Sequence, residues 1–273
     1  MRLRTYTPAP AVAASTPWIA FAFVMPEASS APPTPPVQSE TEKKPSSESL
    51  QLFPERGGQY VDRSFFGRLV FGDESRHRSK CEQHVLNAVQ KSPLVKLMMH
   101  ALRSQGCPVD VGRHITCEWC SKEVTGGYDP NSNQIVVCYN RCVKQVIPGV
   151  LAHEMLHMFD HCRAHLDFSN VDHVACSEIR AANLMHCSIL SGMLSGTVSL
   201  FNLSQAHARC VKQKALVSIL ASRPELDRRQ GSRIIDKVFD KCYNDLEPVG
   251  RRIRSRSNDA HRAYRERFLY GYD

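Results

Sequence analysis

PGVLAHEMLHMFDHCRAH, residues 148–165, is the most informative stretch of the 273-residue chain. Its first residue is a proline, which suits the first turn of a helix because no helical hydrogen bond is lost there. Ala152, Met155, Leu156 and Phe159 then follow the i, i+3, i+4, i+7 spacing of one helical face. The stretch is therefore predicted to be a helix that buries its apolar face.

Two histidines and a glutamate lie within this predicted helix. His153 and His157 are four residues apart, so their imidazoles lie one turn apart on one face and can bind a single zinc ion. Glu154 occupies the position of the general base in a His-Glu-x-x-His motif. The alternative is a pair of surface histidines on an amphipathic helix. Burial of these three side chains without partners would be costly, which favours the metal site.

A catalytic zinc ion needs a third protein ligand and an open fourth position. The metzincin arrangement requires a glycine at position 160 and a histidine at position 163, but this chain has Asp160 and Arg163. The gluzincin arrangement takes a glutamate from a second helix, and Glu178 lies 21 positions after His157 in a plausibly helical segment. Glu178 is therefore the expected third ligand. The competing candidates are Asp160, His161, His165, Asp167 and His173.

Two of these competitors, His161 and His165, continue the four-residue series of the motif. Either could steady an oxyanion or orient a ligand. The alternative is that both are surface residues.

The rest of the folded part is predicted to be mostly helical. Residues 80–105 have helical spacing that Pro93 kinks or divides. Residues 109–142 combine strand-favouring residues with turn signals, which indicates a small sheet or hairpin. The expected later helices are at about 172–187, 204–222 and 231–246. The predicted fold class is α+β, mostly helical and zincin-like, with a small cysteine-bearing sheet before the motif helix.

Composition divides the chain into three parts. Residues 1–60 hold most of the prolines and no cysteine, so we expect a disordered extension or linker. Its first 26 residues contain two arginines and no acid, which is also typical of a weak mitochondrial targeting segment. Residues 61–250 are predicted to form the domain that carries the motif, and residues 251–273 a basic tail or helix. The apolar stretch Trp18–Met25 is short of the ~20 residues that cross a bilayer.

The net charge of +8 favours phosphate, an anionic membrane surface or nucleic acid as a neighbour, although a solvated basic surface explains it equally.

The 11 cysteines indicate an oxidising compartment or structural metal, and their odd number leaves at least one thiol unpaired. One group could form a four-cysteine zinc knuckle or two disulfide-linked loops; its members are Cys117, Cys120, Cys138 and Cys142. Three more could join the motif helix to its neighbour; these are Cys162, Cys176 and Cys187.

The sequence resembles a family of zinc metalloproteases of the mitochondrial intermembrane space. The resemblance rests on HEMLHMFDHCRAH at 153–165 and ACSEIRAANL at 175–184, and it continues in GGYD at 126–129 and CYNDLEP at 242–248. One departure is visible. The family usually has Ser-Gly-Asp-Cys after the Asn-Leu at 183–184, whereas this chain has Met185-His186-Cys187.

The resemblance implies an endopeptidase with one catalytic zinc ion, bound by His153 and His157, and with Glu154 as the catalytic residue. It implies a metallopeptidase domain that is peripheral on the inner membrane, in the intermembrane space, with most cysteines oxidised. The expected substrate is the precursor of ATP synthase subunit 6, which the family processes and helps to assemble. The assembly role need not require proteolysis.

Two other classes of function are open on the sequence alone. One is a DNA- or RNA-associated protein, or a DNA-repair protease, with a four-cysteine zinc knuckle and a basic tail. The other is an assembly factor without proteolytic activity. One zinc ion and few free thiols per chain would favour the endopeptidase. For the endopeptidase no nucleic-acid partner is expected. Two zinc ions and reduced cysteines would favour the nucleic-acid classes.

Overall fold

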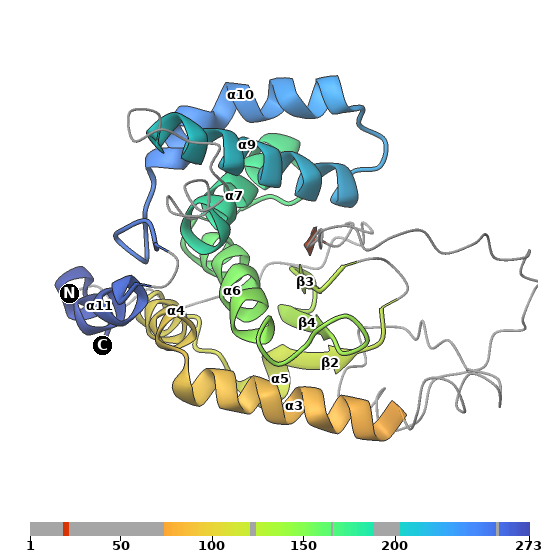
Figure 1. Cartoon of the computed structure of the whole chain (residues 1–273), viewed down its shortest axis with the longest axis vertical. Coiled ribbons are helices and arrows are strands. Elements are labelled where there is room, and N and C mark those ends of the chain that lie inside the picture. Colours follow the sequence, from red (N-terminus) through yellow and green to blue (C-terminus); the bar gives the residue numbers. More distant parts are fainter. Residues whose placement is uncertain (1–18, 22–73, 121–123, 165, 188–202, 255–256) are drawn as a thin grey trace, which may run out of the picture.

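The computed structural model describes residues 19–21, 74–120, 124–164, 166–187, 203–254 and 257–273 (Figure 1). The helices are α3 (Glu74–Lys91), α4 (Pro93–Ser104), α5 (Val111–His114), α6 (Ile147–Ala164), α7 (Val171–Ala181), the π-helical turn η2 (Ala182–His186), α9 (Leu203–Ser222), α10 (Arg228–Asn244), α11 (Asp259–Arg265) and the 3-10 turn η4 (Arg267–Tyr270). The strands are β1 (Ile19–Phe21), β2 (Ile115–Glu118), β3 (Gly126–Asp129) and β4 (Gln134–Cys138). This is the predicted mostly helical α+β class, with a small sheet before the motif helix α6.

The strands form one sheet in the order β1-β3-β4-β2. β3 and β4 are an antiparallel hairpin in which Gly126 lies opposite Val137. Asn133, in the turn, has a φ of 51°, a left-handed conformation that asparagine adopts more readily than most residues. β2 runs parallel to β4, and β1 pairs antiparallel with the outer edge of β3. The predicted hairpin therefore has a strand on each side, and β1 comes from within the N-terminal extension.

Pro93 divides the predicted helix over 80–105 into α3 and α4. Proline is tolerated at the start of α4, where the Ser92 hydroxyl accepts a hydrogen bond from the Val95 N–H at 3.4 Å. Gly106 follows the end of α4 with a φ of 86°, a conformation that costs glycine little. The break turns the chain so that both helices contact α6.

Helix α6 lies at the centre of the molecule. It contacts α3 and α4, strands β3 and β4, and α7 (Figure 1). Because these elements surround it, every side chain from Val150 to Asp160 is buried. The predicted apolar face is confirmed, and the polar residues between the apolar ones are buried as well.

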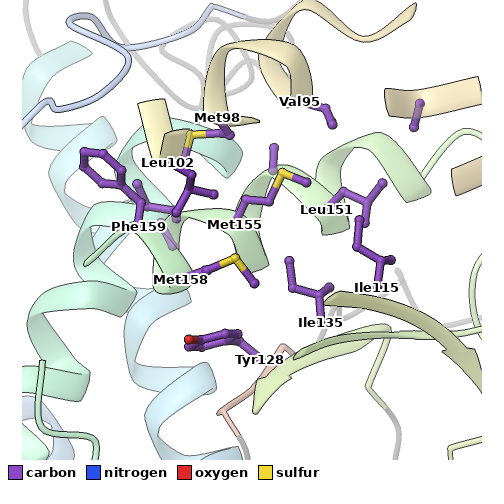
Figure 2. Packing of buried hydrophobic residues seen from close by; sticks show 14 of the residues in the cluster. Val95, Met98, Leu102, Ile115, Tyr128, Ile135, Leu151, Met155, Met158 and Phe159 are labelled. Atoms are coloured by element: carbon purple, nitrogen blue, oxygen red, sulfur yellow. The ribbon is translucent and has the colours of Figure 1, made fainter. Parts of the chain in front are cut away.

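Figure 2 shows how α6 is packed. Met155 and Met158 lie between Leu102 of α4 and two residues of the sheet, Tyr128 and Ile135. A second buried cluster joins α7 to α9 and α10, while α7 also contributes residues to the first. The two helices that carry the motif residues and Glu178 are thus fixed by packing on several sides.

Five disulfides cross-link these elements: Cys81–Cys117, Cys107–Cys162, Cys120–Cys138, Cys176–Cys242 and Cys187–Cys210. The remaining thiol belongs to Cys142, as the odd number of cysteines required. Each bridge constrains the unfolded chain and stabilises a fold of this size by roughly 2–4 kcal/mol.

The disulfide pairing overturns two of the expectations for the cysteines. The four-cysteine zinc knuckle is wrong, because Cys117 and Cys120 belong to different disulfides and Cys142 is free. The direct bridge between the motif helix and its neighbour is also wrong. Cys162 of α6 is bonded to Cys107, which follows α4, and Cys176 of α7 is bonded to α10.

The described part of residues 251–273 contains the short helix α11 and the 3-10 turn η4. α11 packs against α4. The Arg254 guanidinium donates two hydrogen bonds to Asp259, at 2.8 and 3.1 Å, near the start of α11. Among the residues that the structure describes, no helix combines the length and apolar character needed to cross a membrane.

Candidate metal centre

The three predicted metal ligands meet where α6 and α7 lie side by side. One ligand atom from each of His153, His157 and Glu178 lies within 4.8 Å of the other two. The two Nε2 atoms are 3.0 Å apart, and the Glu178 carboxylate oxygens lie 3.8 Å from Nε2 of His153 and 3.6 Å from Nε2 of His157. All three side chains are at most 1% exposed. The sequence spacing of the motif and the position of Glu178 therefore lead to one buried cluster.

Local structure explains why Glu178 faces the two histidines. Asn170 caps α7 by accepting a hydrogen bond from the Asp172 N–H at 3.0 Å, which fixes where this helix begins. The Cys176–Cys242 disulfide ties α7 to α10. Ser218 of α9 donates a hydrogen bond to the Glu178 carboxylate. Three helices thus hold Glu178 against α6.

Burial controls the charge of the cluster. It lowers the pKa of His153 well below its usual range, and the neighbouring His157 adds to this shift. Burial lowers the pKa of His157 to about 3, with a further contribution from the Arg180 charge. Both imidazoles are therefore neutral at physiological pH, which leaves a lone pair free for a metal ion. Burial also raises the pKa of Glu178 to about 8. A nearby cation would favour its charged form.

The donor set fits a borderline divalent cation such as zinc. Two neutral imidazole nitrogens and one carboxylate oxygen are the ligands of several catalytic zinc sites. Within the described residues, Glu178 Oε1 is buried and has no hydrogen-bond partner. Such a group is costly to bury unless a ligand satisfies it.

Glu154 lies next to this cluster and is fully buried. Neither of its carboxylate oxygens has a hydrogen-bond partner among the residues that the structure describes. Burial raises its pKa well above the usual range, and the nearby Glu178 carboxylate adds to this. A carboxylate with a raised pKa can hold a proton near neutral pH, as a general acid or base must.

The close approach of β3 to α6 depends on Gly126. A Cβ at this position would lie 2.6 Å from Val150 Cγ1 and 2.7 Å from the Val136 carbonyl oxygen. It would also lie 3.7 Å from Glu154 Oε1. Only glycine lets the strand pass so near Val150 of α6. Strand β3 thus passes close to the Glu154 carboxylate.

A hydrogen-bond chain orients His157. The Ser177 hydroxyl donates to Asp160 Oδ2 at 2.9 Å and lies 2.7 Å from His157 Nδ1. Because the hydroxyl hydrogen is committed to Asp160, the Nδ1–H of His157 donates to Ser177. This tautomer leaves the Nε2 lone pair directed at Glu178 and His153. Partners of this kind orient the histidine ligands of metal sites.

Buried charges hold this chain in place. Arg180 pairs with Asp160 and, at 3.0 Å, with Asp245, and it also donates to the Glu247 carbonyl. Arg163 pairs with Asp245 and Glu247. Asp160, one of the competing ligand candidates, therefore supports the site through its contacts with Ser177 and Arg180. Among the described residues, Arg163 and Arg180 pair with these carboxylates and not with Glu178, which leaves Glu178 available to a metal ion.

His186 is the residue that sequence reasoning missed. Its Nε2 lies 2.8 Å from His153 Nδ1, so it orients the first histidine as Ser177 orients the second. His186 is the last residue of η2. The sequence signal for it was the departure from the family pattern at 185–187. That departure indicated only a changed helix end, whereas the fold brings His186 into contact with His153.

The other competing candidates lie outside the cluster. His161 Nδ1 is 2.8 Å from the Tyr128 hydroxyl, so this ring is turned towards the sheet. Asp167 is exposed and its backbone N–H donates to His173 Nδ1 at 3.2 Å. His165 is outside the described residues.

Comparison with known proteins places this geometry in a family. Residues 79–250 match the model of the peptidase M76 family. Three relatives bear the name mitochondrial inner membrane protease ATP23 homolog. The Homo sapiens protein is 39% identical over an alignment that covers 81% of this chain and 89% of its own length. The Xenopus laevis protein is 42% identical, with 82% of this chain and 94% of its own length covered. The Danio rerio protein is 40% identical, with 84% of this chain and 92% of its own length covered. No solved structure matches the chain. With its buried metal-binding group and this extent of similarity, the chain belongs to the peptidase M76 family of metallopeptidases.

Proposed function

We propose that this metallopeptidase is a zinc endopeptidase of the mitochondrial intermembrane space, peripheral on the inner membrane. We further propose that it matures the precursor of ATP synthase subunit 6 and assists its assembly. The observation that carries the peptidase assignment is the convergence of His153, His157 and Glu178 beside the unpartnered carboxylate of Glu154.

In this proposal His153, His157 and Glu178 bind one zinc ion and Glu154 is the catalytic residue. When bound, zinc polarises the scissile carbonyl and lowers the pKa of a water molecule towards ~7. Glu154 accepts a proton from the attacking water and delivers it to the leaving amine, so it ends the cycle as it began. Ser177 and His186 hold the two imidazoles in the tautomer that presents Nε2. No cysteine is needed as a nucleophile.

The sheet supports a polypeptide substrate. The outer edge of β3 already accepts an extended segment, since β1 pairs with it antiparallel and places Phe21 opposite Gly126. Strand addition supplies main-chain hydrogen bonds to any extended peptide, whatever its sequence. A substrate that bound at this edge would pass beside Glu154, which lies close to Gly126.

The compartment and the substrate rest on two further observations. Ten of the 11 cysteines are in disulfides, which is typical of an oxidising compartment and rare in the cytosol. The relatives are mitochondrial inner membrane proteases by name. The four cysteines that could have formed a zinc knuckle are in disulfides or free, so the main argument for a nucleic-acid-associated protein no longer holds.

The Glu154→Gln variant tests the proposed chemistry. It should bind zinc and fold like the parent but lose cleavage by ~100- to 10,000-fold, because a carboxamide cannot accept the proton. Glu82→Gln, at an exposed position of α3, is the matched control and should cleave like the parent. Cleavage of a subunit 6 precursor by Glu154→Gln at the parental rate would refute the assignment. Expressing the variant in cells that lack the enzyme separates assembly from proteolysis.

A further inference from the structure

Exposed apolar side chains cluster at the C-terminal end of the chain. Three consecutive residues of η4, Phe268, Leu269 and Tyr270, are 61%, 69% and 47% exposed. Among the described residues, the other large hydrophobic side chains of similar exposure are Leu86 and Val143, which stand alone. Single exposed apolar residues are ordinary, whereas a cluster marks an interaction site. We call residues 268–270 the apolar tip.

The apolar tip is anchored to the folded domain. Tyr272, just beyond it, is buried and its ring lies 6.4 Å from that of Phe159 in α6. Arg103 of α4 donates a hydrogen bond to the Asp273 carbonyl at 2.6 Å. The Tyr270 ring packs so closely on Gly250 that a Cβ there would lie 2.3 Å from its hydroxyl oxygen. The exposure of the tip therefore does not come from a frayed terminus.

Most of the charged residues next to the apolar tip in the sequence are arginines, while Glu266 and Asp273 are acidic. Arg262 and Arg265 of α11 are both exposed and lie about two turns and one turn before it, respectively. Arg262 and Arg251 pair with the same carboxylate, Glu266, which leaves a net positive charge among the three. In the described part of the chain no ion pair involves Arg265. Arg267 lies over the Tyr264 ring, at 4.5 Å, at the base of the tip.

We propose that the apolar tip and its arginines form the surface by which the enzyme docks on an anionic lipid bilayer. Phe268 and Leu269 enter the headgroup region while Arg262 and Arg265 contact lipid phosphates. Apolar side chains flanked by arginine are the combination that binds membrane interfaces without crossing them. This inference rests on the proposed peripheral location and names the surface responsible for it. A protein partner would require no anionic lipid, so the two occupants can be told apart.

Vesicle co-sedimentation with the full chain tests this surface. The probes are phosphatidylcholine vesicles with and without cardiolipin. The parent should bind the cardiolipin vesicles in a salt-dependent way and bind neutral vesicles weakly. Phe268→Ser with Leu269→Ser should weaken binding at least ~10-fold, because both side chains lose burial in lipid. Arg262→Gln with Arg265→Gln should weaken it by ~10-fold or more at low salt.

The matched control is Leu86→Ser, which removes a leucine of α3 that is 50% exposed. It should bind cardiolipin vesicles like the parent, and all variants should retain the parental melting temperature because the altered residues are exposed. Parental binding by the tip variants would overturn the proposal and direct attention to a protein partner. Equal binding of the parent to neutral and anionic vesicles would also overturn it. Vesicle binding requires no catalysis, so its result is independent of the proposed peptidase chemistry.

Discussion

Replacing Ser177 by alanine removes the hydroxyl that links His157 to Asp160. Both hydrogen bonds are short, at 2.7 and 2.9 Å, and Ser177 is fully buried. The His157 Nδ1–H is left without a partner, and Asp160 Oδ2 loses a donor. Each unsatisfied buried group costs about 1–3 kcal/mol, so the free energy of unfolding should fall by about 2–6 kcal/mol. The imidazole also loses its fixed orientation, so zinc affinity should fall by ~10- to 100-fold.

Zinc affinity, measured by competition with a graded chelator, distinguishes an orienting role from a purely structural one. Ser222→Ala is the matched control, since Ser222 is also buried but donates only to the Ile219 carbonyl within α9, at 3.1 Å. It should lose some stability and keep zinc affinity. If Ser177→Ala held zinc as tightly as the parent, the hydrogen-bond chain would have no part in the metal site.

Two further predictions concern the cysteines and the N-terminal extension. Alkylation of the denatured, unreduced protein should label one thiol, on Cys142, and labelling of most cysteines would contradict the disulfide pairing. Removal of residues 1–58 should leave the melting temperature nearly unchanged, because the described cores lie in residues 81–272. It also removes β1 from the β3 edge, so the KM for an extended peptide should fall; an unchanged KM would show that β1 does not compete with substrate.

The motif helix α6 was predictable because its signals are local. The four-residue spacing of His153 and His157 and the apolar face between them need no knowledge of the rest of the fold. The same apolar face indicated a buried helix, and the cost of burying His153, Glu154 and His157 pointed to partners for them. Which surfaces cover these polar residues was not predictable, because α7 and the β3 edge come from other parts of the chain and only the fold brings them to α6.

The cysteines show where sequence reasoning failed. Cys117 and Cys120 have knuckle-like spacing, but disulfide pairing depends on which side chains the tertiary fold brings together. Cys117 is bonded to Cys81, 36 residues away and on a different element, and no local pattern specifies that distance. His186 was missed for the same reason, because its contact with His153 spans 33 residues.

The zinc content per chain after graded chelation tests the central claim most directly, because it asks whether His153, His157 and Glu178 bind the metal. The parent and Glu154→Gln should each retain one zinc ion to the same chelator concentration. Glu178→Gln should release zinc at a much lower concentration, since a neutral carboxamide is a poorer ligand. His161→Gln, which alters a histidine outside the cluster, should behave like the parent. Retention of zinc by Glu178→Gln, or its loss from His161→Gln, would contradict the assigned ligands.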